Sequence, residues 1–186
     1  LNRVNRMEEG VMNFHFAGKY DGNPDSLPQR DPFPPNAVQY KECDSTKQMS
    51  RIMLIGSSIL LVLLYFFLKV VSRNDFSLLD QIIPIVIALV VTFIVHEPLH
   101  AIWFKKDVYM YHNIKQSMLF VSGTEDFSKA RFILMGLCPA FVLGVIPLIV
   151  FCIFPNLIGV GIFGSLAFVS GFGDFMNVYW TLTQVP

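Results

Sequence analysis

The stretch IIPIVIALVVTFIVHEPLHAIWF, from Ile82 to Phe104, is an apolar run long enough to cross a membrane, yet it carries two histidines and a glutamate near its end. His96 and His100 are four residues apart, so they share one face of a helix, where their imidazoles can hold one zinc ion. Glu97 neighbours His96 and is well placed to act on a water molecule at that metal. A carboxylate inside a membrane helix is costly and usually marks a functional site.

The composition predicts an integral membrane protein. Of the 186 residues, 53% are hydrophobic, and the mean hydropathy of +0.52 is higher than a soluble domain of this size would show. The zero net charge gives no indication of a nucleic-acid partner, and three cysteines without a close pair do not indicate a disulfide framework. The apolar residues fall in long blocks that predict four membrane spans, at Ile52–Val71, Ile82–Phe104, Phe132–Phe154 and Leu157–Leu182.

We therefore expect an all-α polytopic membrane protein with about four transmembrane helices. Residues 1–51 are polar and predict a short cytosolic N-terminal arm, which leaves residues 52–186 as one membrane-embedded domain. Within the arm, residues 13–16 and 37–40 are candidates for short strands.

The segment between spans two and three is too long for a simple turn. Val108–Tyr111 and Met118–Val121 predict a β-hairpin, which could pair with an extended peptide or only fold over the helix ends. Lysine and arginine are concentrated before span one and between Lys105 and Arg131. This bias predicts a multi-pass protein of the cell membrane with both termini in the cytoplasm.

Asp174 is the predicted third metal ligand. In the predicted topology, spans two and four run in the same direction, and His100 and Asp174 are nearly equally far along them. Since a helix rises about 1.5 Å per residue, the two side chains are expected at the same depth, toward the cytosolic side. Asn177 follows three residues later on the same helix face, where it could bind the substrate backbone or orient Asp174.

Apart from residues at the span ends, the ionisable side chains inside the four predicted spans are those of His96, Glu97, His100 and Asp174. One zinc site would account for all four, with Glu97 as the general base for hydrolysis of a peptide bond. The predicted partners are therefore the lipid bilayer and a peptide or membrane-protein substrate. Two alternatives stay open: a catalytically silent metal-binding membrane protein, and a transporter of protons or metal ions.

The motifs His96-Glu97-x-x-His100 and Gly173-Asp174-x-x-Asn177, together with Phe16-Ala-Gly-Lys-Tyr near the N-terminus, resemble the Putative zincin peptidase family of small bacterial membrane proteins. More distantly, they are similar to the site-2 class of intramembrane metalloproteases. The resemblance implies a zinc-dependent metalloprotease of the bacterial cytoplasmic membrane. It also implies that His96, His100 and Asp174 bind zinc and that Glu97 is catalytic.

Overall fold

The computed structural model describes residues 12–29, 38, 40, 41, 43, 45–72, 75–113 and 118–186. These divide into two compact units, each described here by itself. The sheet unit comprises residues 1–37 and 100–126, and the helical unit comprises residues 38–99 and 127–186. This division differs from a boundary between residues 51 and 52, which stays a prediction about the membrane-embedded part.

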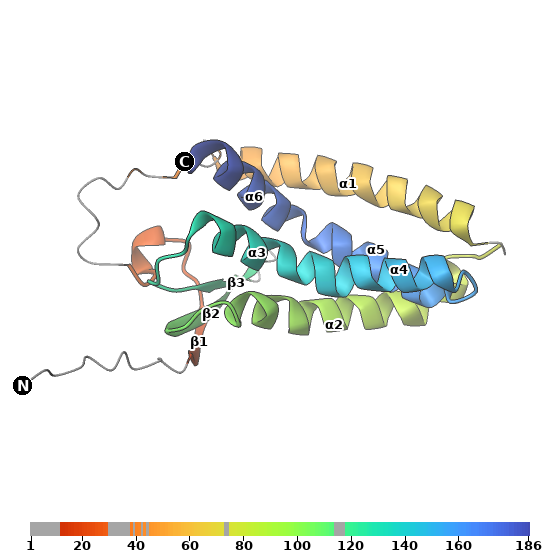
Figure 1. Cartoon of the computed structure of the whole chain (residues 1–186), viewed down its shortest axis with the longest axis horizontal. Coiled ribbons are helices and arrows are strands. Elements are labelled where there is room, and N and C mark those ends of the chain that lie inside the picture. The colour runs from red at the N-terminus through yellow and green to blue at the C-terminus, as the bar shows by residue number, and fades with distance from the viewer. Residues whose placement is uncertain are drawn as a thin grey trace, which may run out of the picture. The chain divides into compact units, whose positions relative to one another are not determined.

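The sheet unit contains three strands in the order β1-β2-β3 (Figure 1). Strands β2 (Asp107–Asn113) and β3 (Met118–Ser122) form the predicted antiparallel hairpin. Strand β1 (Asn13–Lys19) contains the predicted strand at residues 13–16 and pairs with β2 in parallel. The chain is therefore mostly helical rather than all-α: the predicted hairpin is present, and a segment from near the N-terminus joins it as a third strand.

The second strand predicted in the N-terminal arm, at residues 37–40, lies partly outside the described residues. Of its four positions, Val38 and Tyr40 are described, and neither belongs to a strand.

The helical unit is built almost entirely from helices (Figure 1). They are α1 (Thr46–Val71), α2 (Ile82–Ala101), α3 (Lys129–Pro139), a π-helical segment η4 (Ala140–Val145), α4 (Ile146–Ile153), α5 (Ile158–Ser170) and α6 (Phe172–Gln184). The last two residues of α2 are grouped with the sheet unit, although the helix is continuous.

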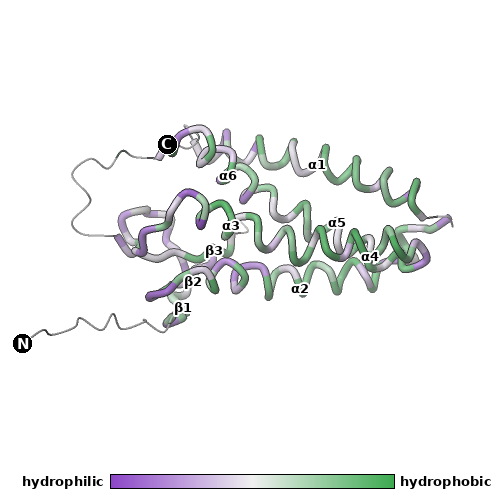
Figure 2. The backbone as a smooth tube through the Cα atoms, in the orientation of Figure 1, coloured by the Kyte–Doolittle hydropathy of each residue, from purple (hydrophilic) through white to green (hydrophobic). Residues whose placement is uncertain are grey.

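Three helical stretches within the described residues are long and apolar enough to cross a membrane, namely Lys47–Val71, Ile82–Ala101 and Lys129–Ile153. The pair α5 and α6 counts as a fourth if it is treated as one bent span. Hydrophobic residues run along α1, α2, α4 and α5 (Figure 2), and large side chains such as Phe66 and Phe93 face outward. Outward apolar surface of this kind is compatible with contact to lipid.

The predicted fourth span is not straight. It is broken at Gly171, where α5 and α6 meet at a bend of 46°. The Ser170 hydroxyl donates a hydrogen bond to the carbonyl of Ala167, 2.7 Å away, so this turn of α5 is closed by a side chain. A Cβ atom on Gly171 would come within 3.1 Å of the Cβ atom of Ala140, so the break is also a point of close contact with η4. The first turn of α6, which carries Asp174, therefore lies directly after a bend.

Close backbone contact fixes α5 against the third span. At Gly164, an added Cβ atom would lie 2.9 Å from the carbonyl oxygen of Gly144, and at Gly144 it would lie 2.8 Å from Phe168. Small residues on span helices permit such approach. Gly144 lies in η4, a widened turn that follows Pro139, a residue with no N–H for the helical hydrogen-bond ladder.

Candidate metal centre

The motif His96-Glu97-x-x-His100 lies in the last turns of α2, after an apolar run that is helical throughout. One nitrogen from each imidazole and one oxygen from Glu97 all lie within 4.8 Å of one another. Pro98 is inside this helix, which continues past it to Ala101. The helical spacing therefore brings the three side chains together, as the sequence predicts.

These groups are largely withdrawn from solvent. Glu97 is 8% exposed and His100 is 6% exposed, whereas His96 is somewhat more accessible. Burial of a carboxylate and two imidazoles is costly unless each has partners or holds a metal. A cluster of buried ionisable side chains is more typical of a functional site than of an apolar core.

Asp174 reaches this cluster from the first turn of α6. Its Oδ2 atom lies 3.0 Å from Nε2 of His96, across 78 residues of sequence. Two ligand atoms on a tetrahedral zinc ion, each bonded at 2.0–2.1 Å, are about 3.3 Å apart. The observed spacing is therefore close to that of two atoms that share one ion.

Equal distances along spans two and four predict that Asp174 lies at the depth of His100, and the contact just described is with His96, one turn earlier in α2. Because α5 and α6 meet at a bend of 46°, a residue count along a straight span gives the depth of Asp174 only approximately. Asp174 is also outside the set of three side chains whose ligand atoms lie within 4.8 Å of one another, a set in which Glu97 is the carboxylate.

The donor set fits zinc. Two imidazole nitrogens and a carboxylate oxygen are ligands typical of catalytic zinc sites, which leave one position for water or substrate. A second carboxylate beside them matches the arrangement in which a general base acts next to the ion. His96, His100 and Asp174 are the residues that could hold the metal, and Glu97 is the residue that could move a proton.

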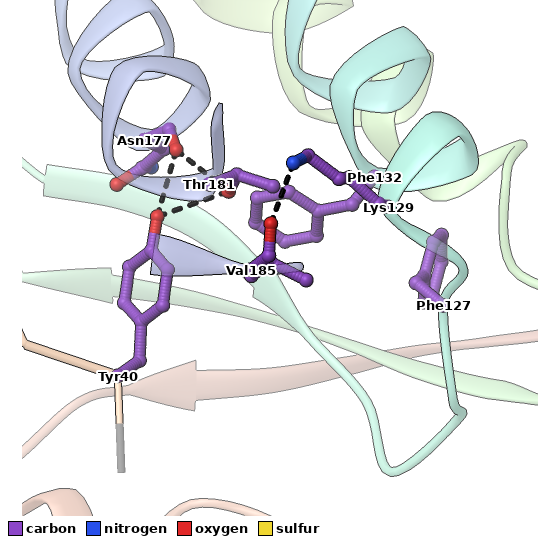
Figure 3. A pocket seen from close by; sticks show the side chains of 7 residues that line it. All are labelled: Tyr40, Phe127, Lys129, Phe132, Asn177, Thr181 and Val185. Carbon is purple, nitrogen blue, oxygen red and sulfur yellow. Dashed lines mark hydrogen bonds between the residues drawn. The ribbon is translucent and has the colours of Figure 1, made fainter. Parts of the chain in front are cut away.

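Asn177 lies three residues after Asp174 in α6 and lines a cavity of ≈ 350 Å³ (Figure 3). The other lining residues are Tyr40, Phe127, Lys129, Phe132, Thr181 and Val185. The backbone carbonyl of Asn177 accepts hydrogen bonds from the hydroxyls of Tyr40, at 2.7 Å, and Thr181, at 2.8 Å. A catalytic role for its side chain stays a prediction.

Sequence reasoning does not single out Tyr40. It is 137 residues from Asn177, and it stands in a stretch interpreted as a possible strand. No periodicity or motif connects two such distant positions. Residues 37–40 predict only a short strand, which concerns secondary structure rather than a partner.

A family model described as “Putative zincin peptidase” matches residues 89–186, just over half of the chain. The matched region begins within α2 and includes the four side chains of the candidate centre. Searches of curated proteins and of solved structures found no match.

Proposed function

The chain belongs to the Putative zincin peptidase family, and from this premise we propose that it is a membrane-embedded zinc metallopeptidase of the His-Glu-x-x-His type. One observation carries the proposal. A helix that is apolar enough to cross a membrane places His96, Glu97 and His100 together at its end, and a distant helix brings Asp174 to 3.0 Å from His96. The family implies zinc and peptidase activity, and the donor set fits that metal.

The four side chains have different roles in this proposal. His96, His100 and Asp174 hold the metal, while Glu97, fixed by burial next to His96, is the general base. When bound, zinc would polarise the carbonyl of a peptide bond and make a nearby water molecule easier to deprotonate. Glu97 takes the proton of that water and delivers it to the leaving amine. Asn177, one turn along α6 from Asp174, binds the substrate backbone.

We further propose that the site lies near the cytosolic face of a membrane. Lys41 is hydrogen-bonded to Gln184, and Lys129 donates to the carbonyl of Val185, so the residues before α1, the start of α3 and the end of α6 share one end of the helical unit. Lys47 and Arg51 follow Lys41 closely in the sequence. An excess of basic residues at one end favours a cytoplasmic location for that end, and hence for the C-terminal part of the chain.

Cysteine labelling tests this orientation. In a variant in which Cys43, Cys138 and Cys152 are replaced by serine, a single cysteine at exposed Lys47 should react with a membrane-impermeant maleimide only after the cells are opened. Labelling of intact cells would contradict the proposed orientation.

The substrate class follows from the position of the site. A metal centre at the end of a membrane helix can reach a peptide near the membrane surface or a segment of a membrane protein. We therefore propose a peptide or membrane-protein substrate.

The decisive variant is Glu97→Gln. The amide keeps the shape of the side chain but cannot accept the proton, so the protein should keep its zinc and lose cleavage by about 10²–10⁴-fold. Zinc content is measured together with cleavage of single-span membrane proteins and fluorogenic peptides in proteoliposomes. Glu125→Gln is the matched control, because Glu125 accepts a hydrogen bond from the backbone of Lys105 in the sheet unit, which an amide oxygen can also do.

Three results would contradict the proposal. A zinc-loaded Glu97→Gln protein that cleaves at the wild-type rate would remove Glu97 from the mechanism. A wild-type protein that binds no zinc would remove the metal centre. A zinc-loaded wild-type protein that cleaves none of these substrates would favour the catalytically silent alternative.

A further inference from the structure

The helix that carries Asp174 begins directly after a bend. The residue before α6 is Gly171, which has no side chain to cap the N–H groups of the first turn. The bend of 46° at this point means that α6 does not simply continue the direction of α5. Close contacts at Gly171 and Gly173 pack the start of the helix, and the direction of α6 also depends on contacts made further along it.

Those contacts come from the segment that precedes α1. The hydroxyl of Tyr40 donates to the carbonyl of Asn177 at 2.7 Å and lies 3.0 Å from the hydroxyl of Thr181 (Figure 3). The ring of Tyr40 meets Trp180 edge to face, with centroids 6.4 Å apart. Three residues after Thr181, Gln184 also contacts this segment.

Lys41 completes the attachment through its backbone. Its N–H donates to Oε1 of Gln184 at 2.9 Å, and its carbonyl accepts from Nε2 of the same amide at 2.8 Å. At the end of α6, the ammonium of Lys129 donates to the carbonyl of Val185, which a free helix end would leave exposed. Successive turns of α6 are thus held from outside the helix.

The Tyr40 contact is the one nearest to the metal centre. Asn177 is three residues from Asp174, which is about 4.5 Å along the helix axis. The hydroxyl of Thr181 bonds the carbonyl of Asn177 from within α6, whereas the hydroxyl of Tyr40 reaches the same carbonyl from outside the helix. Loss of the Tyr40 hydroxyl therefore removes the hydrogen bond that ties this point of α6 to the segment before α1.

We propose that Tyr40 is a positioning residue for the metal centre: its hydroxyl fixes α6 so that the carboxylate of Asp174 stays against His96. The inference rests on the proposed zinc site, in which Asp174 is a ligand. Outer partners that orient a ligand typically contribute 10–100-fold to metal affinity. The segment before the first span is accordingly part of the catalytic unit, rather than only a connection to it.

The main test is a double-mutant cycle on zinc affinity, measured by competition with a chelator. Tyr40→Phe keeps the ring against Trp180 and removes only the hydroxyl, and it should weaken zinc binding about tenfold. In an Asp174→Ala background the same change should have no further effect, because the ligand that Tyr40 positions is gone. Tyr179→Phe, at a side chain on α6 that is 58% exposed, is the control and should leave the affinity unchanged.

Thr181→Val is a comparison variant within α6. It removes a hydroxyl bond inside the helix but leaves the hydrogen bond from Tyr40 to the carbonyl of Asn177, so it should weaken zinc binding less than Tyr40→Phe does. Equal weakening by Tyr40→Phe with and without Asp174 would show general loosening, and an unchanged affinity would show no role. Either result would overturn the inference.

Hydrogen exchange separates failure of this inference from failure of the proposed function. The amides of residues 172–178 should exchange faster in Tyr40→Phe than in Tyr179→Phe, whether or not zinc is bound. If the wild-type protein binds no zinc, the proposed function fails, and exchange alone decides whether Tyr40 holds this part of α6. Equal exchange in the two variants would overturn the inference even if the zinc site is correct.

Discussion

Within the described residues, two histidine–aspartate pairs have nearly the same length, one in each unit. In the sheet unit, Nε2 of His15 lies 2.8 Å from Oδ1 of Asp107, and in the helical unit, Nε2 of His96 lies 3.0 Å from Oδ2 of Asp174. The side chains of the first pair are 44% and 51% exposed, whereas those of the second are 13% and 17% exposed. Both pairs join an imidazole nitrogen to a carboxylate oxygen, but the first is exposed to solvent and the second is largely buried.

The surroundings decide what each pair can do. His15 stacks on Tyr109 at the edge of the sheet, where water screens the charges and the pair contributes little to stability. His96 has Glu97 and His100 within metal-binding distance and little solvent. Burial makes isolated charge expensive, so a buried pair with further ligands nearby is a candidate metal centre, while an exposed pair is a surface contact.

The largest difference between the pairs should be zinc content. His96→Ala removes one of the ligands that the site requires, so the purified protein should lose its bound zinc, whereas His15→Ala should keep about one zinc ion per chain. Metal analysis of the two variants after dialysis decides the point. If His96→Ala keeps as much zinc as His15→Ala, His96 is not a zinc ligand, and the buried pair does not differ from the exposed pair in metal binding.

The aspartates should differ in the same direction. Asp174→Ala should weaken zinc binding by more than the roughly 10–100-fold expected for an outer partner, because a ligand itself is lost. Asp107→Ala should leave the affinity as it is. If a chelator competes equally for zinc in both variants, the third ligand is another residue.

A substitution at Thr92 measures how much a buried polar group on the histidine face of α2 lowers the stability of the protein. It lies one turn before His96, is 8% exposed, and its hydroxyl has no hydrogen-bond partner within the described part of the chain. Thr92→Val should therefore raise the free energy of unfolding by about 1 kcal/mol. Thr181→Val should lower it, since Thr181 is also buried, at 2% exposed, and donates to the carbonyl of Asn177. Denaturant unfolding in detergent compares them, and a loss of stability in Thr92→Val would mean that this hydroxyl has a partner.

The smallest effect is expected at the exposed pair. The hydrogen bond from His15 holds the pKa of Asp107 below its ordinary value. A carboxyl group with a lowered pKa in the folded state stabilises the fold above its unfolded pKa, and this contribution is lost as the pH falls through the folded pKa. His15→Ala should raise the pKa of Asp107 toward the ordinary value, as followed by NMR titration. An unchanged pKa would show that the contact is not formed in solution.

Much of the candidate centre follows from spacing along one helix. His96, Glu97 and His100 are brought together by helical periodicity alone, and the length of the apolar run around them predicts α2 to within a few residues. The β2–β3 hairpin follows from local alternation in the same way. Local patterns fix these features because each depends on residues that are close in the sequence.

The bend at Gly171 could not be obtained in this way. The small residues of the fourth span predict close helix packing, but a straight span and a broken one can have the same composition. The structure shows the break at Gly171, next to a close contact with η4. A residue count along a straight span therefore gives the depth of Asp174 only approximately, and the structure places its carboxylate 3.0 Å from His96. The pairing of β1 with β2 is equally hidden, because a parallel neighbour about ninety residues away leaves no local signal.

The sequence by itself determined the apolar helices, the hairpin and the His-Glu-x-x-His face. Each of these features depends on a spacing of two to four residues or on the length of an apolar run. Only the tertiary structure decided that Asp174 meets His96, that α6 departs from α5, and that the hydroxyl of Tyr40 bonds the carbonyl of Asn177. The physical reason is that the contacts of Asp174 and Tyr40 join segments 78 and 137 residues apart, whose approach depends on packing and backbone clearance across the helical unit.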